Sequence, residues 1–538
     1  FTANATNRLG KVAEGNTVCD FDTEETKRKV SVSSAIAPFE WKDAKINLID
    51  TPGLFDFEAG LYEGIRAAES VVITVSGKSG CAVGTEKAFK LAKAQKKAIM
   101  FFVSKLDNEN ADFDKAVASL KDTFGATACP IIVPYKENNV VKSYVNLIDM
   151  KAYTYNEKGV ATEVEMPTIA GLDDYINSLN EAIAETDEAL MDKYFSGEQF
   201  TKEEFMTGLS KGVSTGSVLP IVCGSTITMA GVTLLQDAIV KILPSPVENG
   251  KELAKNSADK VVEIPCNEDD PLAAYVFKTV ADPFVGKLSY IKVVSGKLSA
   301  SSAPINARTG QPEKLGKLLI VQGKKQEDTE YIGAGDIGCV TKLSEAVTGD
   351  SLCDAKRVVS FNVSKFPKAC LQMAIKPKVK GEENKIVQGI QRLMEEDPTV
   401  SLENNYETKQ MLVGGMGEQH IDVIVSRLKA KFGVDSVLEK PRVAYRETVR
   451  KTVKVQGRHK KQSGGHGQFG DIWVEFGPCD SEGLLFEEKV FGGAVPRNFF
   501  PAVEKGLQDC IKKGPLAGYP VVGLRATLVD GSYHPVDS

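Results

Sequence analysis

Three short apolar runs in the first hundred residues constrain the fold more than any other feature. They cover residues 45–50, 69–76 and 98–104, and helical patterns such as Thr85–Gln95 lie between them. Continuous apolar strands belong to sheets that are buried on both faces, and their alternation with helices is typical of a parallel sheet. The sequence therefore predicts an α/β domain at the start of the chain.

This α/β domain is expected to extend over residues 1–248. A further strand at 219–223 and a further helix at Leu234–Leu243 follow the same pattern, whereas the acidic, mixed stretch from about 130 to 215 has the character of an insertion. Pro244 ends the last helix, because proline cannot continue it and starts a linker instead.

The rest of the chain predicts three further domains. Short β runs separated by glycine turns predict a small β-barrel over residues 249–365. Residues 366–440 give strand, helix, strand, strand, helix and strand, which is the order of a ferredoxin-like βαββαβ domain, and Gly433 is the stop signal of its second helix. A fourth segment covers residues 441–538.

Composition limits the class of protein. The 538 residues suggest three to four domains, and the 42% hydrophobic and 26% charged content excludes a disordered chain or a small disulfide scaffold. The 10 cysteines are scattered without metal-ligand or CxxC spacing, which is typical of reduced thiols in a cytoplasmic protein. No apolar run reaches the roughly 18 residues of a membrane helix, so we expect no membrane span.

The net charge of −6 argues against nucleic-acid binding over the whole surface but not against one basic face. Residues 441–470 hold eight Lys or Arg against one acidic residue, and they lead into a Gly-rich loop with His466 and Phe469. This pattern suits contact with phosphates and RNA loops, and the alternative interpretation is a solvated strand face with a hairpin turn.

The sharpest local motif is Asp50-Thr51-Pro52-Gly53, which follows the first apolar strand directly. An aspartate at this position can hold Mg²⁺ through water, and the glycine lets a backbone N–H approach a terminal phosphate. The alternative interpretation is a plain strand-to-turn boundary, since Pro-Gly favours turns.

Two further loops follow later strands of the same domain. Ser104-Lys105-Leu106-Asp107 offers a carboxylate to the N1 and N2 edge of guanine and a lysine stem to the purine face. Gly224-Ser225-Thr226 offers a backbone N–H to the guanine O6. Each loop alone is weak evidence, but all three motifs lie at the C-terminal ends of predicted parallel strands, where α/β folds bind ligands. Together they predict a guanine-nucleotide site.

A phosphate cradle of the form G-x-x-x-x-G-K-[ST] is missing. Gly77-Lys78-Ser79 comes nearest, but Val72 stands where the first glycine is needed, and the triplet follows the Asp50 strand instead of preceding it. We interpret it as a surface turn. Residue 1 is Phe and the chain ends without a stop signal, so we expect a fragment whose cradle lies upstream of Phe1.

Seven stretches in order make a family resemblance specific. They are Asp50–Phe57 (DTPGLFDF), Asp282–Lys287 (DPFVGK), Gly415–Ile421 (GMGEQHI), Val443–Arg450 (VAYRETVR), Gln462–Gly470 (QSGGHGQFG), Leu516–Val522 (LAGYPVV) and Asp530–Ser538 (DGSYHPVDS). Over essentially its whole length, the chain resembles bacterial elongation factor G or a close paralogue. The resemblance implies a P-loop-type G domain truncated at its start, a β-barrel domain II, a ferredoxin-like domain III and an incomplete, α+β ribosomal-S5-like domain IV. It also implies that the phosphate loop and the C-terminal domain are absent from the chain.

The resemblance also implies cofactors, partners and residue roles. GTP and Mg²⁺ are the implied cofactors, with Ser31 and Asp50 on Mg²⁺. The implied nucleotide contacts are Ser31, Asp50, Thr51, Pro52, Gly53, Ser104, Lys105, Asp107, Gly224, Ser225 and Thr226. The implied tip residues, which reach the decoding centre and the tRNA–mRNA duplex, are Gly464, Gly465, His466, Gly467, Gln468 and His534. The ribosome, with its rRNA, is the implied partner, and we expect a cytoplasmic monomer without membrane attachment.

Three positions depart from the family pattern. Leu54 stands where translation GTPases usually have the His that orients the attacking water, and a leucine has no group that could polarise it. Ser104 replaces the usual Asn, and Ser31 replaces the usual Thr while keeping a hydroxyl. These departures leave GTP binding in place and put fast hydrolysis, the catalytic step, in question.

The sequence therefore supports a GTP-dependent elongation factor that promotes ribosomal translocation of tRNA and mRNA. The alternatives are a paralogue that binds GTP and the ribosome with slow or absent hydrolysis, and a ribosome-protection protein. Among the remaining polar and aromatic residues, we expect His420 to be structural, His459 to lie on the surface, and Trp41 and Trp473 to be packing residues.

Overall fold

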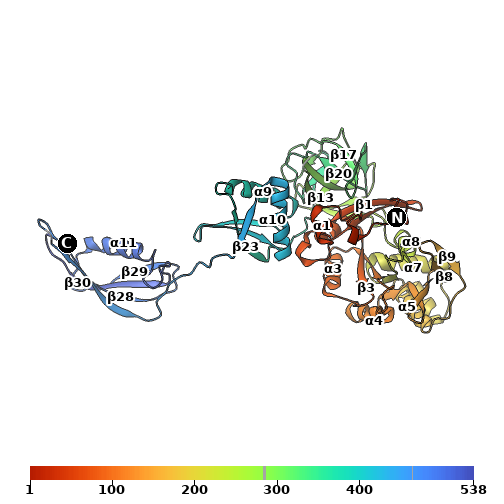
Figure 1. Cartoon of the computed structure of the whole chain (residues 1–538), viewed down its shortest axis with the longest axis horizontal. Helices are drawn as coiled ribbons and strands as arrows, with labels where there is room; N and C mark the ends of the chain where they lie inside the picture. The colour runs from red at the N-terminus through yellow and green to blue at the C-terminus, as the bar shows by residue number, and fades with distance from the viewer. Residues whose placement is uncertain (283–285, 463) are drawn as a thin grey trace. The chain divides into compact units, whose positions relative to one another are not determined.

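The computed structural model describes residues 1–282, 286–462 and 464–538. The chain divides into two compact units (Figure 1). Unit 1 comprises Phe1–Asn404 and Met411–Lys440, and unit 2 comprises Asn405–Gln410 and Pro441–Ser538. The predicted multidomain α/β fold is confirmed. Two of the stretches that carry the family resemblance, Asp282–Lys287 and Gln462–Gly470, lie partly outside the described residues.

A parallel sheet forms the centre of the first part of unit 1. Its order is β3 (Ser70–Ser76), β4 (Ala98–Ser104), β10 (Leu219–Cys223) and β5 (Ala128–Pro130). Residues of α2 (Ala59–Ala67), α3 (Val83–Ala94), α4 (Phe113–Phe124) and α8 (Val232–Ile242) pack around the same core. Every residue of β4 is buried, which explains why its sequence is an unbroken apolar run.

The apolar run at 45–50 does not join this sheet, contrary to its prediction as a parallel strand. Within the described residues, β2 (Ala44–Asp50) pairs with β1 (Ala35–Trp41) alone, in an antiparallel hairpin. A cavity of about 330 Å³ is lined by β2 on one side and by the start of β3 on the other. This cavity separates β2 from β3, so the hairpin does not join the parallel sheet although both strands are apolar.

A mixed subdomain lies in the chain between β5 and β10. It consists of an antiparallel sheet, β6 (Ile132–Glu137), β7 (Val140–Asn146), β8 (Lys151–Tyr155) and β9 (Ala161–Val164), and the helices α5 (Leu172–Ala184), α6 (Glu188–Ser196) and α7 (Lys202–Thr215). A capping box starts α7, in which Thr201 and Glu204 bind each other's backbone N–H groups. Leu209 and Val213 of α7 join the same core as the parallel sheet.

The second part of unit 1 is all-β. Its strands are β11 (Lys251–Asn256), β12 (Val261–Pro265), β13 (Ala273–Asp282), β14 (Gly286–Ser295), β15 (Lys297–Ser299), β16 (Ile305–Asn306), β17 (Leu318–Gln322), β18 (Lys325–Asp328), β19 (Tyr331–Gly333), β20 (Ile337–Thr341), β21 (Ser351–Cys353) and β22 (Val359–Phe361). Seven of them form one antiparallel sheet in the order β16-β21-β13-β14-β20-β17-β18. Alternate residues of β13 enter two different apolar clusters, as the period of two in a strand requires.

The third part of unit 1 has the predicted βαββαβ order. Its elements are β23 (Leu371–Pro377), α9 (Glu383–Glu396), β24 (Ser401–Asn405), β25 (Gln410–Gly415), α10 (Glu418–Phe432) and β26 (Ser436–Glu439), with strand order β24-β25-β23-β26. Ile386 and Ile390 of α9 and Ile421 and Ile424 of α10 share one core. Gly433 adopts φ +68° and ends α10 as predicted, because glycine reaches this left-handed region at no steric cost.

Unit 2 is an α+β domain. Its sheet has the order β27-β28-β30-β29, formed by β27 (Val453–Lys461), β28 (Gln468–Pro478), β29 (Leu484–Glu488) and β30 (Leu524–Ser532). Helix α11 (Phe500–Cys510) packs Phe500, Val503 and Leu507 against Val474 and Leu528 of the sheet. Among the described residues, we find no helix of the length and apolarity that a membrane crossing requires.

Candidate functional site

The structure brings two of the predicted loops together at the ends of β4 and β10. The Ser225 hydroxyl donates a hydrogen bond of 2.5 Å to the Asp107 carboxylate, and Ser225 is 1% exposed. Lys105 and Asp107 are exposed, whereas Leu106 between them is buried and anchors the loop. One carboxylate oxygen of Asp107 is thus held in place beside an open surface.

Backbone contacts fix how the two loops meet. The Gly224 N–H binds the Val103 carbonyl at 3.0 Å, and the Ser225 N–H binds the Ala230 carbonyl at 2.8 Å. A Cβ on Gly224 would lie 2.5 Å from that Ala230 oxygen, so only glycine fits. Since the N–H of Ser225 is already bound, Thr226, which is exposed, is the better source of a donor to a ligand.

A second cluster surrounds Asp50 at the end of β2. The Ser31 hydroxyl donates to Asp20 at 2.7 Å, and the Cys19 thiol hydrogen-bonds to Asp50. Burial and the nearby charge of Asp20 raise the pKa of Asp50 above its usual value, and burial raises the pKa of the Cys19 thiol. Two carboxylates and a hydroxyl are the oxygen donors that Mg²⁺ prefers, and a cation would relieve their repulsion. Asp20 and Cys19 escaped the sequence analysis because no motif marks them.

The loop after Asp50 continues through Thr51 and Pro52 to Gly53, and a Cβ on Gly53 would meet no atom within 4 Å. Leu54 follows as the N-cap of the 3-10 helix η2 (Phe55–Phe57) and is 37% exposed. Leu54, which the resemblance predicts to occupy the position of a catalytic His, is therefore an aliphatic side chain at the surface, without a hydrogen-bonding group.

Asp56, two residues after Leu54, binds the start of helix α10. Its Oδ2 accepts the backbone N–H groups of Gln419 at 3.0 Å and His420 at 3.3 Å. Phe57 is 2% exposed and meets the His420 ring edge-on, with 5.9 Å between ring centres. His420 is 3% exposed, in agreement with its predicted structural role.

The His420 ring is itself fixed on both sides. Its Nδ1 accepts the Met416 N–H at 3.1 Å, so Nε2 carries the proton and faces Asp397 at 3.2 Å. Hydrogen bonds from His420 and Thr399 outweigh the effect of burial and lower the pKa of Asp397.

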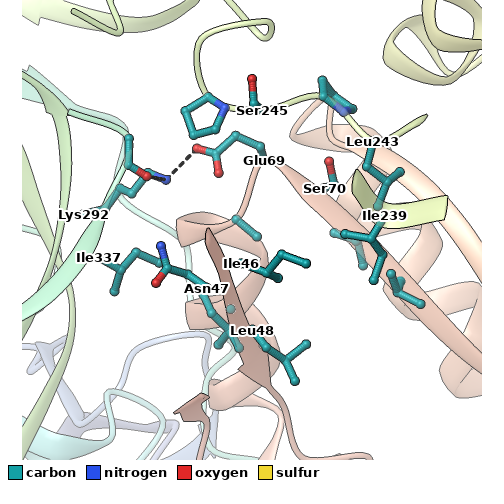
Figure 2. Close-up of a pocket in the computed structure, with 18 of the residues that line it drawn as sticks. Ile46, Asn47, Leu48, Glu69, Ser70, Ile239, Leu243, Ser245, Lys292 and Ile337 are labelled. Atoms are coloured by element: carbon teal, nitrogen blue, oxygen red, sulfur yellow. Dashed lines mark hydrogen bonds and ion pairs between the residues drawn. The ribbon is translucent and has the colours of Figure 1, made fainter. Parts of the chain in front are cut away.

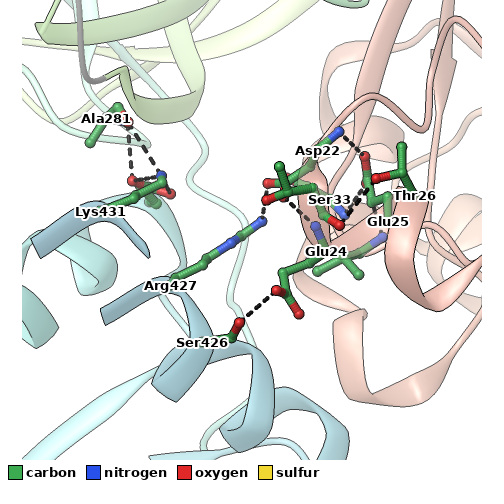
Figure 3. A network of polar contacts seen from close by, with 12 residues as sticks. Asp22, Glu24, Glu25, Thr26, Ser33, Ala281, Ser426, Arg427 and Lys431 are labelled. Atoms are coloured by element: carbon green, nitrogen blue, oxygen red, sulfur yellow. Dashed lines mark hydrogen bonds and ion pairs between the residues drawn. The ribbon is translucent and has the colours of Figure 1, made fainter. Parts of the chain in front are cut away.

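A polar network also joins α10 to the segment that precedes Ser31 (Figure 3). Asp22, the N-cap of α1 (Thr23–Arg28), pairs with the half-buried Arg427 at 2.9 Å, and Ser426 donates to Glu24 at 2.6 Å. The buried carboxylate of Glu25 accepts the N–H groups of Val32 and Ser33 and thereby fixes the turn around Ser31. One helix of the βαββαβ domain therefore contacts both the segment that precedes Ser31 and the loop that follows Asp50.

The cavity between β2 and β3 lies beside these loops (Figure 2). Apolar side chains from both strands and from α8 line it, including Ile46, Leu48 and Ile239. Leu48 is 43% exposed, and the Ser70 hydroxyl is buried without a hydrogen-bond partner. An exposed leucine and an unpartnered hydroxyl mark an incompletely filled space. Gly77-Lys78-Ser79 forms a turn after β3, as we predicted, and does not line this cavity.

Unit 2 brings the predicted tip residues together. The Gly-rich loop between β27 and β28 contains Gly464 and Gly465, both at positive φ, and the N–H of Gly467 binds the Asp537 carboxylate at 2.8 Å. His534 faces the same Asp537, with 3.4 Å between Nδ1 and Oδ2. His466, Gln468 and His534 are exposed, and the ring of His459 contacts Gln468 on the surface as expected. Ser463, which belongs to the same Gly-rich loop, lies outside the described part of the chain.

Comparison with known proteins agrees with this architecture. The model of the elongation factor Tu GTP-binding domain matches residues 1–245, that of elongation factor G domain 2 matches 271–355, that of elongation factor G domain III matches 366–440 and that of elongation factor G domain IV matches 441–538. A crystal structure of a Thermus thermophilus protein is 32% identical with a TM-score of 0.82, and the alignment covers 100% of this chain and 78% of that one.

The order of domains and the GTP-binding-type first domain define a translational GTPase architecture. Within this class, the chain belongs to the elongation factor G family.

Proposed function

We propose that this protein is a GTP-dependent translation factor that binds the ribosome and promotes translocation of tRNA and mRNA. The observation that carries the proposal is the Ser225–Asp107 contact, which holds a carboxylate between two loops of a GTP-binding-type domain. The basic run and the tip loop of unit 2 support a partner made of RNA.

In this proposal Asp107 accepts hydrogen bonds from the guanine N1–H and N2–H groups. Ser225 holds the carboxylate from behind, the stem of Lys105 covers the purine face, and the backbone N–H of Thr226 meets O6. Ser104 closes β4 beneath this loop and is buried, so its role is to support the loop.

Mg²⁺ is assigned to the cluster at the end of β2, where it would neutralise phosphate charge. Ser31 would hold it through its hydroxyl and Asp50 through water, and Asp20, which binds Ser31, would orient that hydroxyl. Burial and, to a smaller extent, the charge of Asp20 raise the pKa of Asp50, and a cation beside the two carboxylates would offset both effects.

The phosphate cradle of the proposal comes from a strand-and-loop segment that fills the cavity between β2 and β3. An added strand would cover Leu48, offer a partner to Ser70 and join the hairpin to the parallel sheet.

Bound GTP would then hold α10 in one position, because Asp22 binds that helix from the segment before Ser31 and Asp56 binds it from the loop after Asp50. Leu54 favours a second candidate function, in which GTP acts as a latch and is hydrolysed slowly or not at all. In both candidate functions the protein binds GTP and the ribosome, and the two differ in the rate of GTP hydrolysis.

Ribosome-stimulated GTP turnover by the full-length protein separates the two candidates, with a Leu54→His variant measured beside it. Fast turnover by the unchanged protein supports the translocation factor and refutes the latch. Slow turnover that Leu54→His accelerates supports the latch, and loss of GTP binding altogether would refute both. Asp107→Asn serves as the control that should bind GTP poorly in either case.

A further inference from the structure

The outer ribbon of unit 2, formed by β27 and β28, carries an unusual alternation of cations and rings on one face. The antiparallel register places Lys454, Gln456, Arg458 and Lys460 of β27 opposite Glu475, Trp473, Asp471 and Phe469 of β28. Residues that pair directly point to the same side of a sheet, so these eight side chains share one face. We name it the ladder face.

Contacts along the ladder face join a cation to each ring. The Lys454 ammonium lies 5.5 Å from the centre of the Trp473 ring, and the Arg458 guanidinium lies 6.0 Å from that of Phe469. Phe469 in turn faces the His534 ring at 6.3 Å. The ladder face is therefore continuous from Trp473 to the tip loop, and it shows that Trp473, which we predicted to be a packing residue, is a half-buried ring beneath a cation.

On the opposite face of the same ribbon, the apolar residues of β28 are not available for a partner. Ile472, Val474 and Phe476 point there and pack with Phe500 and Val503 of α11. The residues of the edge strand β27 are exposed on both faces. The alternation along β28 thus directs its apolar residues toward α11 and its ladder-face residues to the other side.

The charge on the ladder face favours an anionic partner. β27 holds Lys454, Arg458, Lys460 and Lys461 and no acidic residue. Of the acids on β28, Asp471 is engaged by the Gln456 amide at 2.8 Å and the Ser532 hydroxyl at 2.6 Å, and these hydrogen bonds lower its pKa. Glu475 stands opposite Lys454 at the end away from the tip. The ladder face therefore holds three cations against the two carboxylates Asp471 and Glu475, and Lys461 adds a fourth cation at the end of β27.

We propose that the ladder face binds a strand of RNA whose bases are unpaired, in addition to the contact made by the tip loop. Lys454, Arg458 and Lys460 neutralise successive phosphates, and Trp473 and Phe469 offer ring surfaces to bases. The cation–ring contacts hold the long side chains in place before the RNA arrives, which lowers the entropy lost on binding. The inference rests on the proposed function insofar as ribosomal RNA is the source of that strand.

Fluorescence anisotropy with a labelled, unstructured RNA of about 15 nucleotides tests the proposal, over a series of salt concentrations. The triple variant Lys454→Ala, Arg458→Ala, Lys460→Ala should lose at least about tenfold in affinity. The slope of log affinity against log salt concentration should flatten by about two, as three lost phosphate contacts on a single strand require. The matched control is Lys505→Ala, Lys512→Ala, Lys513→Ala, which removes the same charge around α11 and should change affinity less than about threefold. All of these side chains are exposed, so circular dichroism should report unchanged folding.

A second variant separates stacking from charge. Trp473→Leu should weaken RNA binding by about fivefold or more while leaving the salt slope unchanged, because a stacked base carries no counterions. Equal losses in the two triple variants, or no loss in the ladder variants, would overturn the proposal.

Ribosome binding in GTP gives an independent arm. If the unchanged protein and the ladder variants bind ribosomes equally well, the ladder-face proposal is refuted and the proposed function stands. Unchanged protein that binds the RNA but not ribosomes would refute the proposed function alone.

Discussion

The Asp56 carboxylate, in the loop that follows the Asp50 motif, accepts the backbone N–H of His420 at the start of helix α10. The first N–H groups of a helix have no partner within the helix, and here a residue from a different domain supplies one. Since Phe57 packs against the same histidine, the loop and the helix are fixed to each other by a polar and an apolar contact. A movement of this loop must carry α10 with it or break both contacts.

The first prediction concerns this cap. Asp56→Ala should destabilise the docking of α10 by about 1 kcal/mol and should accelerate hydrogen exchange in the first turn of the helix. Gly417→Ala should cause a similar loss from the other side, because its Cβ would lie 2.4 Å from the Asp56 carboxylate. Gly417 has extended backbone at φ −171°, so alanine meets no conformational penalty of its own.

Combining the two substitutions distinguishes this account from two unrelated defects. Once Asp56 is alanine, the carboxylate that Gly417→Ala would clash with is gone, so the double variant should exchange no faster than Asp56→Ala alone. Fully additive effects would show that the two residues do not interact.

The second prediction concerns guanine recognition. Asp107→Asn should lower the affinity of the full-length protein for GTP at least about tenfold and should favour xanthosine triphosphate, because an amide can donate to the xanthine 2-oxo group. Ser225→Ala removes the hydroxyl that holds the Asp107 carboxylate. It should lower the affinity for GTP by a smaller factor without changing the preferred base. Competition against a fluorescent GTP analogue measures both, and an unchanged base preference in Asp107→Asn would argue against the assignment.

The third prediction concerns the cluster at Asp50. Burial is the larger cause of the raised pKa of Asp50, and the charge of Asp20 is the second. Asp20→Asn removes that charge and should therefore stabilise the chain without Mg²⁺ at neutral pH. The same substitution should weaken Mg²⁺-dependent GTP binding, because it takes charge from the proposed metal site. Melting temperatures with and without Mg²⁺ test the predicted gain in stability. GTP affinity at several Mg²⁺ concentrations tests the predicted loss of binding. A variant that loses stability under both conditions would contradict the electrostatic account.

The fourth prediction concerns the boundary between the parallel-sheet domain and the all-β domain. Burial, with a smaller contribution from the Arg66 charge, lowers the pKa of Lys97 from 10.5 to about 8. Below pH 8 the lysine is charged in both the folded and the unfolded chain, so the folded state bears the full cost of burying the charge. Between pH 8 and 10.5 the folded lysine is neutral while the unfolded one still binds a proton, so stability rises with pH across this window.

Lys97→Met removes the charge and keeps the volume. We expect the variant to be more stable than the unchanged protein by about 1–3 kcal/mol at pH 7, and we expect this advantage to shrink toward zero by pH 10.5. Thermal melts at half-unit pH steps measure the difference, and a constant difference across the range would show that the charge is not its cause.

Particular residues show what the sequence could predict. Asp107 and Ser225 could be placed together because each follows an unbroken apolar strand, and parallel strands end at one edge of a sheet. Gly433 could be predicted to end α10 from its position alone. These are local patterns that tertiary structure did not override.

Other features depend on distant partners and had no local signal. Asp56 and Asp20 act through contacts with α10 and Ser31, which no spacing rule connects to them. The apolar strand at 45–50 has the pattern of a parallel strand, yet in the described part of the chain it pairs only with β1. Pairing requires a neighbour, which the pattern of one strand does not specify. Trp473 was predicted to pack because aromatic residues favour strands, and the cation above it comes from the neighbouring strand.

The central claim is that GTP controls how this protein binds the ribosome. The most direct measurement is the affinity of the full-length protein for purified ribosomes with a non-hydrolysable GTP analogue and with GDP, by co-sedimentation or by fluorescence of a label on unit 2. Both the translocation factor and the slow latch predict binding at least about tenfold tighter in the GTP state, a difference of about 1.4 kcal/mol. Equal affinity in the two nucleotide states, under conditions where both nucleotides are bound, would contradict the account.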